Sequence, residues 1–371
     1  MDIAVIGTSR KENEKRVPIH PRHILQISEG VRKSLVFERG YGAAFAVSDE
    51  TLESLTGNRP LEREELLGRF EAVIITKPVP EDLLPMRDGA TVWGWIHSVQ
   101  QERMTQTAID KKLTMIAWEN MFYDTGRERI HIFYRNNEMA GYCGVQHALQ
   151  LRGIDGNFGP PRSVGVLSLG SVSRGAIYSL KGHGFSDITV YTRRHPHLAG
   201  NRIPGIHYRH LISDGKGSFN VIMRGEAKPL IDELAGRDVI VNGMLQDPVN
   251  PVYFIRDDDI KAFTKECLVI DISCDIGMGF SFARPTDFKR PVLKFGNITY
   301  YAVDHTPTLL WDSASFEISS GILEYLDDFA QKKENRVLTE ATDIKLGKIL
   351  NTDILEYQNR LSHYPHLKKE S

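Results

Sequence analysis

The sequence of 371 residues has few cysteines and no surplus of charge of one sign. Its three cysteines, Cys143, Cys267 and Cys274, are an odd number, and they lack the spacing of a metal-ligand motif. All three lie in apolar surroundings, so we expect buried thiols that form no disulfide, in a reducing, cytoplasmic setting. The formal net charge is -2 at pH 7 and no long basic run is present, which excludes nucleic acid as an expected partner.

Long hydrophobic runs are also missing from the chain. No stretch approaches the ~20 apolar residues that cross a membrane, so we expect no membrane partner. Residues 1–16 have the pattern of a short strand followed by polar residues, without the basic start and apolar segment of a signal peptide. The composition, 41% hydrophobic and 25% charged, is ordinary for a globular protein. These features together predict a soluble, cytoplasmic protein.

Short apolar runs alternate with helical patterns along most of the chain. In the first third these runs are MDIAVIG, SLVFERG, EAVIITKP, TVWGWIH and LTMIAWE. Beyond residue 162 they are SVGVLSLG, DITVYTRR, FNVIMRG, DVIVNGM, CLVIDIS and ITYYAVDH. Such alternation, with short helical crossovers, favours doubly wound, mainly parallel sheets. The predicted fold class is α/β, with two Rossmann-like domains and a cleft between them.

The helical patterns on either side of the middle unit predict how the domains are connected. One begins at Glu138, as EMAGYCGVQHALQL, and the other follows His305. We therefore expect a dinucleotide-binding domain over residues 137–306, inserted into a substrate domain formed by 1–136 and 307–371. The polar stretch from about residue 332 onward is expected to be helical.

The segment SLGSVSRGA, residues 168–176, has the pattern of a nucleotide-binding turn. It follows an apolar strand and opens a helix, where backbone N–H groups can approach phosphates. Gly170 and Gly175 are retained, whereas Ser168 stands where the first glycine is usual. Gly170, Ser171 and Val172 are candidate cofactor contacts.

The strand after this turn ends in two arginines, Arg193 and Arg194. An acidic residue at that point would accept hydrogen bonds from the ribose 2′-hydroxyl of NAD, whereas arginines pair with a 2′-phosphate. The sequence therefore predicts NADPH as the cofactor in preference to NADH.

Later strands of the middle unit supply further candidates. VNGM and DISCDIGMG place small or polar residues where a backbone could approach the cofactor, which adds Asn242, Gly243, Asp271 and Asp275 to the predicted cofactor contacts. No further ligands accompany the two aspartates, so we expect no metal site. Asp304 and His305 close the last strand at the predicted domain junction, where a ligand lying in the cleft could be contacted.

Titratable side chains follow successive strands of the first domain. Lys77 comes after AVIIT, His97 ends VWGWIH and Glu119 ends MIAWE. Because α/β folds place ligands at the carboxyl ends of strands, we expect these groups to converge as an acid/base set. Arg16, in KENEKRVPIHP, offers the fork that binds a carboxylate through two hydrogen bonds.

Taken in order, these motifs resemble the superfamily of alanine dehydrogenase and lysine-forming saccharopine dehydrogenase. The resemblance rests on KRVPIHP, ITKP, GWIH, AWE, EMAGYCGV, GSVSRGA, YTRR, VNGM, DISCD and VDHTPTLL, and covers roughly residues 1–325. Within the superfamily, the chain is most similar to the NADPH-dependent carboxyethylornithine synthases. The resemblance implies that Arg16 anchors a carboxylate, that Lys77 and His97 are acid/base residues, and that Glu119 contacts the incoming amine.

The resulting hypothesis is an oxidoreductase acting on CH–NH bonds. It would condense a 2-oxo acid, pyruvate in the first instance, with the amine of ornithine or lysine through an imine that NADPH reduces. One alternative is reductive amination with ammonia, as in alanine dehydrogenase. Another is a protein that binds NADPH or an amino acid without catalysis. Enzymes of this superfamily are often homo-oligomers, so self-association is also expected.

Overall fold

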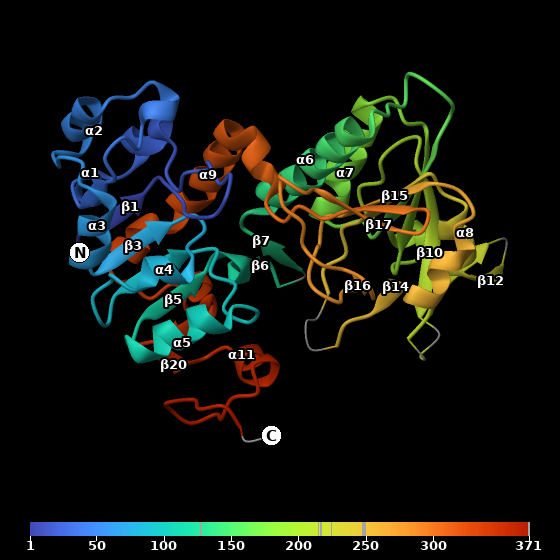
Figure 1. Ribbon diagram of the computed structural model, residues 1–371. Helices are drawn as coiled ribbons and strands as arrows, with labels where there is room; N and C mark the ends of the chain where they lie inside the picture. Colours follow the sequence, from blue (N-terminus) through green and yellow to red (C-terminus); the bar gives the residue numbers. More distant parts are fainter. Residues whose placement is uncertain (127, 214, 216, 224, 247–249, 370–371) are drawn as a thin grey trace. The chain divides into compact units, whose positions relative to one another are not determined.

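The computed structural model describes residues 1–126, 128–213, 215, 217–223, 225–246 and 250–369. The chain forms two compact units, shown in Figure 1. Unit 1 comprises Met1–Tyr134 and Leu310–Ser371, and unit 2 comprises Arg135–Leu309. None of the helices in the described residues is both long and apolar enough to cross a membrane.

Unit 1 is built on a seven-stranded sheet in the order β2-β1-β3-β4-β5-β19-β20. The first five strands are parallel, and the last two, contributed by the C-terminal segment, are antiparallel to their neighbours. The bounds are β1 Ile3–Ile6, β2 Leu35–Phe37, β3 Ala72–Ile75, β4 Thr91–Gly94, β5 Thr114–Ala117, β19 Thr342–Lys345 and β20 Lys348–Ile349.

Both faces of this sheet are buried. Along β1, Ile3 and Val5 enter one apolar core while Ala4 and Ile6 enter the other. Helix α9 (Trp311–Ala330) packs on the first face, and α3 (Arg63–Arg69) and α5 (Glu102–Asp110) pack on the second. The remaining elements are α1 Glu29–Arg32, α2 Asp49–Thr56, α4 Pro80–Leu83, α10 Arg336–Glu340, α11 Thr352–Tyr357, the hairpin β6 Phe122–Asp124 and β7 Arg129–His131, and the 3-10 helices η1 Pro21–Gln26, η2 Ala43–Phe45 and η3 Trp118–Asn120.

The prediction that the chain beyond residue 332 is wholly helical is wrong. Strands β19 and β20 form a hairpin there, joined by Leu346 and Gly347, which both have positive φ of 49° and 78°. A two-residue turn with two positive φ angles matches the right-handed twist of a hairpin. Ile344 and Ile349 from this hairpin are buried in the second core of unit 1. The burial of these two side chains outweighs the polar composition of the segment.

Unit 2 is built on a nine-stranded sheet in the order β12-β11-β10-β9-β8-β13-β15-β18-β17. The six strands from β10 to β18 are parallel, with antiparallel strands at both edges. The bounds are β8 Ser163–Leu167, β9 Asp187–Thr192, β10 His207–Ser213, β11 Phe219–Met223, β12 Glu226–Pro229, β13 Val239–Asn242, β15 Cys267–Asp271, β17 Val292–Phe295 and β18 Ile298–Tyr301.

Helices α6 (Tyr134–Arg152) and α7 (Ser171–Gly182) pack on one face of this sheet, and α8 (Leu230–Ala235) packs on the other. A small parallel pair, β14 (Tyr253–Ile255) and β16 (Gly279–Phe280), and the 3-10 helices η4 Pro196–Leu198, η5 Asp257–Ala262 and η6 Thr306–Leu310 complete the elements. The prediction of an α/β fold with mainly parallel sheets in two domains is confirmed. The three cysteines are buried thiols.

The contact between α6 and α7 is too close for side chains. A Cβ on Gly175 would lie 1.7 Å from the carbonyl oxygen of Glu138, and one on Gly141 would lie 1.8 Å from that of Val172. Backbone atoms of one helix therefore touch the other, and this packing holds the first turn of α7 against α6.

We predict that Gly175→Ala destabilises the protein by about 1–3 kcal/mol, because the added methyl group collides with backbone that cannot move aside. Gly182→Ala, in the same helix, is the matched control because a Cβ there meets nothing within 4 Å. Urea unfolding measures both variants. Equal stability of the two would contradict the proposed packing.

Candidate active site

Arg16 lies in the loop that follows β1, and it is only 4% exposed. Its Nε donates to Oε1 of Glu14 at 2.8 Å, and its guanidinium lies 4.9 Å from the centroid of the Trp95 ring. Burial alone would raise the pKa of Glu14, but the charges of Arg16 and Lys77 lower it below its ordinary value. The carboxylate of Glu14 therefore lies in the field of two predicted site residues.

Lys77 follows β3 by two residues, and its position depends on the neighbouring strand. A Cβ on Gly94, the last residue of β4, would lie 1.9 Å from the carbonyl oxygen of Ile75. Only glycine permits this approach, which brings the two strand ends together. Trp95 N–H then donates to the Thr76 carbonyl at 3.1 Å, and Ser9 Oγ donates to the Lys77 carbonyl at 3.2 Å.

His97 and Glu119 contact each other at the carboxyl ends of β4 and β5. The Glu119 carboxylate accepts hydrogen bonds from the backbone N–H groups of Ile96, at 3.2 Å, and His97. His97 Nδ1 lies 3.9 Å from Oε1 of Glu119. His97 also has a positive φ of 53°, a strained conformation for a residue with a Cβ, and such strain is concentrated at functional sites.

The pKa of Glu119 is raised to about 8. Burial is the main cause, and the nearby carboxylate of Asp343 adds to it, while the backbone N–H donors act in the opposite direction. A carboxyl group with this pKa can exchange a proton near neutral pH. Its side chain keeps 23% of its area exposed, so a ligand could reach it.

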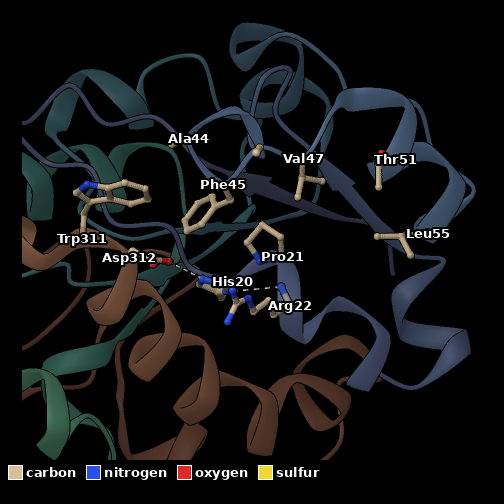
Figure 2. Close-up of a pocket in the computed structure, with 11 residues that line it drawn as sticks. His20, Pro21, Arg22, Ala44, Phe45, Val47, Thr51, Leu55, Trp311 and Asp312 are labelled. Atoms are coloured by element: carbon tan, nitrogen blue, oxygen red, sulfur yellow. Dashed lines mark hydrogen bonds and ion pairs between the residues drawn. The ribbon is translucent and has the colours of Figure 1, made fainter.

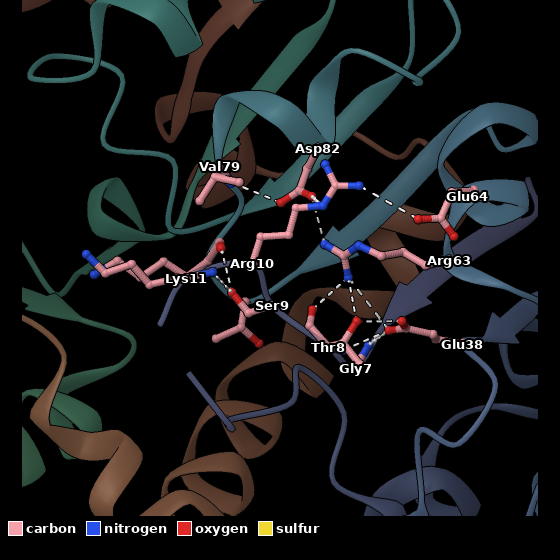
Figure 3. A network of polar contacts seen from close by, with 12 residues as sticks. Gly7, Thr8, Ser9, Arg10, Lys11, Glu38, Arg63, Glu64, Val79 and Asp82 are labelled. Carbon is pink, nitrogen blue, oxygen red and sulfur yellow. Dashed lines mark hydrogen bonds and ion pairs between the residues drawn. The ribbon is translucent and has the colours of Figure 1, made fainter. Parts of the chain in front are cut away.

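A network of buried charges, drawn in Figure 3, holds the loops that carry Arg16 and Lys77. Glu38 accepts from the backbone N–H groups of Gly7 and Thr8, both at 2.7 Å. Arg63 donates to the Thr8 carbonyl at 2.8 Å and to Asp82 at 2.9 Å, and Asp82 accepts from Val79 N–H at 3.0 Å. The ends of β1, β2 and β3 are thereby tied together.

The structure thus brings the four predicted site residues of unit 1 to one edge of its sheet. Arg16, Lys77, His97 and Glu119 follow β1, β3, β4 and β5, which are consecutive strands in the sheet order. Sequence reasoning missed the network that supports them, as well as Asp343 and His131 near Glu119. Because these contacts join segments distant in sequence, no local pattern marked them.

Unit 1 also contains a pocket of about 410 Å³, shown in Figure 2. Phe45, Trp311 and Pro21 contribute apolar walls, and the pair of His20 and Asp312, 2.9 Å apart, lies at its side. None of the predicted site residues lines this pocket.

In unit 2 the predicted nucleotide turn is stabilised by hydrogen bonds of two serine hydroxyls. Ser168 has a φ of 81°, which glycine adopts easily and which costs other residues about 1–2 kcal/mol. Its hydroxyl bonds to that of Ser173 at 2.7 Å and donates to the Gly243 carbonyl at 3.1 Å. These hydrogen bonds hold Ser168 in a left-handed conformation that glycine adopts more easily.

The beginning of α7 has room for a ligand. Gly170 is the N-cap residue, Ser171 and Val172 form the first turn, and a Cβ on Gly170 would meet nothing within 4 Å. Gly243 is more crowded, since a Cβ there would lie 2.7 Å from Ser173 Oγ and would require that side chain to move. The turn therefore fits the pyrophosphate of a dinucleotide, which binds at helix N-termini.

Arg193 and Arg194 follow β9, next to β8 in the sheet, and both are exposed. Within the described part of the chain, neither guanidinium forms an ion pair or a side-chain hydrogen bond. Their charges are thus available to an anionic ligand.

The other predicted contacts of unit 2 differ in exposure. Asp271 is 0% exposed, and its carboxylate accepts from Asn242 Nδ2 at 2.9 Å and from the Tyr300 hydroxyl at 2.7 Å. Burial raises the pKa of Asp271 to about 7. Asp275, four residues later, is half-buried. Asp304 and His305 are hydrogen-bonded to each other, with 24% and 3% of their side chains exposed.

Comparison with known proteins identifies the family. The model of the alanine dehydrogenase/PNT N-terminal domain matches residues 6–140, and that of the C-terminal domain matches residues 192–355. The chain belongs to the alanine dehydrogenase/PNT family. It is accordingly an oxidoreductase.

Similar proteins include enzymes with two different names. N(5)-(carboxyethyl)ornithine synthase of Clostridium botulinum is 27% identical, over 87% of this chain and 96% of that protein. Alanine dehydrogenase of Mycolicibacterium smegmatis is 21% identical, over 94% and 92%. Among solved structures, an L-alanine dehydrogenase superimposes with a TM-score of 0.72 at 15% identity, covering 96% of this chain and 99% of that one.

The raised pKa of Glu119 predicts a pH dependence of stability. The group titrates near 4.5 when unfolded and near 8 when folded, so between these values the folded state holds the extra proton. Its contribution to the free energy of unfolding therefore falls as pH rises through this window, by at most about 1.4 kcal/mol per unit. We expect Glu119→Gln to gain stability relative to the unsubstituted protein over this range.

Urea unfolding from about pH 5 to about pH 8 measures this difference. Glu356→Gln, which removes a carboxylate from an exposed position, is the control and should show no such trend. A stability difference for Glu119→Gln that stays constant with pH would show that Glu119 titrates normally.

Proposed function

We propose that the protein catalyses the NADPH-dependent reductive condensation of a 2-oxo acid, pyruvate in the first instance, with the amine of ornithine or lysine. The observation that carries this proposal is the similarity to N(5)-(carboxyethyl)ornithine synthase along 87% of the chain. The cluster of Arg16, Lys77, His97 and Glu119 supports it, because these side chains supply the charges and protons that the reaction needs.

Arg16 would hold the carboxylate of the 2-oxo acid. Its guanidinium is already oriented by Glu14 and by the Trp95 ring, so little side-chain entropy remains to be lost on binding. Glu119 would contact the amine, which attacks the carbonyl carbon to give a carbinolamine. This arrangement converts an encounter of two substrates into a reaction within one site.

Lys77 or His97 would protonate the hydroxyl group that leaves as water when the carbinolamine becomes an imine. Both lie at the same sheet edge as Arg16, and proton transfer of this kind contributes roughly 10²–10⁴-fold to rate. Bound NADPH supplies the hydride that reduces the imine carbon.

The cofactor would bind to unit 2. The first turn of α7, with Gly170, Ser171 and Val172, would hold the pyrophosphate, and Arg193 and Arg194 would pair with the 2′-phosphate. Gly243, which has no side chain, would let the backbone approach the cofactor closely. Asn242 and Asp271 were predicted as cofactor contacts, but both are fully buried, so they would support the turn from behind. Asp275 remains a proposed cofactor contact, and Asp304 and His305 remain proposed substrate contacts.

Reductive amination with ammonia is the second candidate, favoured by the similarity to alanine dehydrogenases. The two reactions share the carboxylate anchor and the hydride step, and they differ in the amine that the site admits. A homo-oligomeric state is likewise proposed, and light scattering would measure it.

The amine donor distinguishes the two reactions. With pyruvate and NADPH present, we expect NADPH oxidation with ornithine or lysine and far less with ammonia, measured by the loss of NADPH absorbance. NADPH oxidation with ammonia but with neither ornithine nor lysine would show that the protein is an amino acid dehydrogenase. Arginine is included as an amino acid whose side chain is a poor nucleophile.

Lys77→Met tests the chemistry within the same assay. We expect kcat to fall by about 10²-fold or more, while NADPH binding stays unchanged. Lys348→Met, an exposed position on β20, is the matched control and should keep full activity. Retention of most of kcat by Lys77→Met would exclude Lys77 as an acid/base group.

The cofactor preference rests on Arg193 and Arg194. Replacing both with Ala should weaken NADPH binding roughly tenfold or more, because hydrogen bonds to charged groups are lost, while NADH binding stays the same. Calorimetric titration with each cofactor measures this. An equal loss for NADH would show that the arginines do not contact the 2′-phosphate.

A further inference from the structure

The C-terminal hairpin places a second carboxylate, that of Asp343, near Glu119. Asp343 lies on β19 and is 2% exposed. Its Oδ1 accepts hydrogen bonds from the side-chain amides of Asn120, at 2.8 Å, and Asn351, at 2.9 Å. The hydroxyl group of Ser98 is also close enough to act on the Asp343 carboxylate as a hydrogen-bond donor.

Asp343 affects Glu119 in two ways: its charge raises the pKa of Glu119, and it forms a hydrogen bond with the residue that follows Glu119. Asn120 is the residue after Glu119, so its amide ties the short helix η3 to β19. Beside this contact, Ala117 N–H donates to the Ala341 carbonyl at 2.8 Å. These two contacts hold the backbone on both sides of Glu119 against the C-terminal segment.

Burial and the carboxylate of Asp343 are the causes that raise the pKa of Glu119, and its backbone N–H donors lower it. The titratable groups near it are Asp343 on β19, which raises its pKa, His97 after β4, whose Nδ1 lies 3.9 Å from its Oε1, and His131 on β7, which is hydrogen-bonded to the Glu119 backbone. Burial lowers the pKa of His131 to about 4, so its ring is neutral near neutral pH. Asp353, at the start of α11, acts on Asp343 in turn and raises its pKa further.

Carboxylates placed like this bind a proton more tightly than an ordinary glutamate does, because a like charge and burial both oppose ionisation. The amine substrate requires such a group. Primary alkyl amines are protonated near neutral pH, and an ammonium group has no lone pair with which to attack a carbonyl carbon. A base at the amine position must remove that proton first.

We propose that Glu119, with Asp343 behind it, is the base that takes a proton from the ammonium group of the incoming amine. In this step the Glu119 carboxylate and R–NH₃⁺ become the Glu119 carboxylic acid and R–NH₂, and the freed electron pair then attacks the carbonyl carbon. Asp343 does not touch the substrate and is a positioning residue, which acts through Glu119. The proposal rests on the proposed function, in which Glu119 contacts the amine.

The test compares Asp343→Asn with the unsubstituted protein. The side chain of Asn has the same shape and keeps an acceptor for Asn120 and Asn351, but it carries no charge. We expect the acidic limb of the pH profile of kcat/KM for the amine to move to lower pH by about one unit, since the like charge is gone. The plateau should fall severalfold, because a less basic carboxylate removes the proton more slowly.

Glu356→Gln is the matched control. It removes one negative charge from the same C-terminal segment, at an exposed side chain, so its pH profile should superimpose on that of the unsubstituted protein. If Asp343→Asn does not fold, as judged by circular dichroism and NADPH binding, Asp343→Ser takes its place. An acidic limb that stays in place in the folded variant overturns the proposal.

A second measurement separates this proposal from the proposed function. The infrared band of the protonated Glu119 carboxyl, identified by its loss in Glu119→Gln, is titrated without substrate. A lower midpoint in Asp343→Asn, together with the kinetic shift, supports the proposal. A lower midpoint without the kinetic shift overturns Glu119 as the amine's base, and an unchanged midpoint overturns the role of Asp343. No turnover with any amine, whatever the midpoint, refutes the proposed function itself.

Discussion

Burial of the parallel strands on both faces is the constraint on which the arrangement of unit 1 depends. Successive residues of β1 enter opposite cores, with Ile3 on one side and Ala4 on the other. A strand of this kind cannot hold polar side chains along its length without a large desolvation cost. Polar side chains that could take part in catalysis are therefore confined to the strand ends. Because the strands are parallel, their carboxyl ends lie at one edge of the sheet.

Charges at that edge are partly buried, and each one has a specific neighbour. Arg16 is paired with Glu14, and Arg63 with Asp82. Moving such ions out of water costs several kcal/mol each, which pairing offsets only when the geometry is good. The pairs therefore fix the positions of the loops after β1 and β3 more than they add to stability. Glu119 differs, since its neighbours are backbone N–H groups, the His97 ring and another carboxylate, and its pKa is raised to about 8.

Most of the fold could be predicted from the sequence because the signals are local. Runs such as AVII and CLVID are continuous apolar segments bounded by polar residues, and both form buried parallel strands. The C-terminal hairpin was missed because β19 and β20 are short and mostly polar. Ile344 and Ile349 are the two residues of the hairpin that belong to the apolar core, which is too few to give a strand pattern. For the candidate site, strand-end position was sufficient to predict that Lys77, His97 and Glu119 lie at one edge of the sheet. It could not reveal Arg63 or Asp343, whose partners lie far away along the chain.

The sequence by itself determined the class of the fold, the order of its strands along the chain and the residue types that follow them. These features depend on hydrophobic periodicity and on turn residues, which act over a few positions. Only the tertiary structure decided that Ser168 holds a glycine conformation and that Gly94 lets two strand ends touch. It also decided that a carboxylate from the C-terminal hairpin lies behind Glu119. Those features depend on the distances between atoms of segments that lie far apart in the sequence. Such distances determine which side chains are buried and how strongly their charges interact.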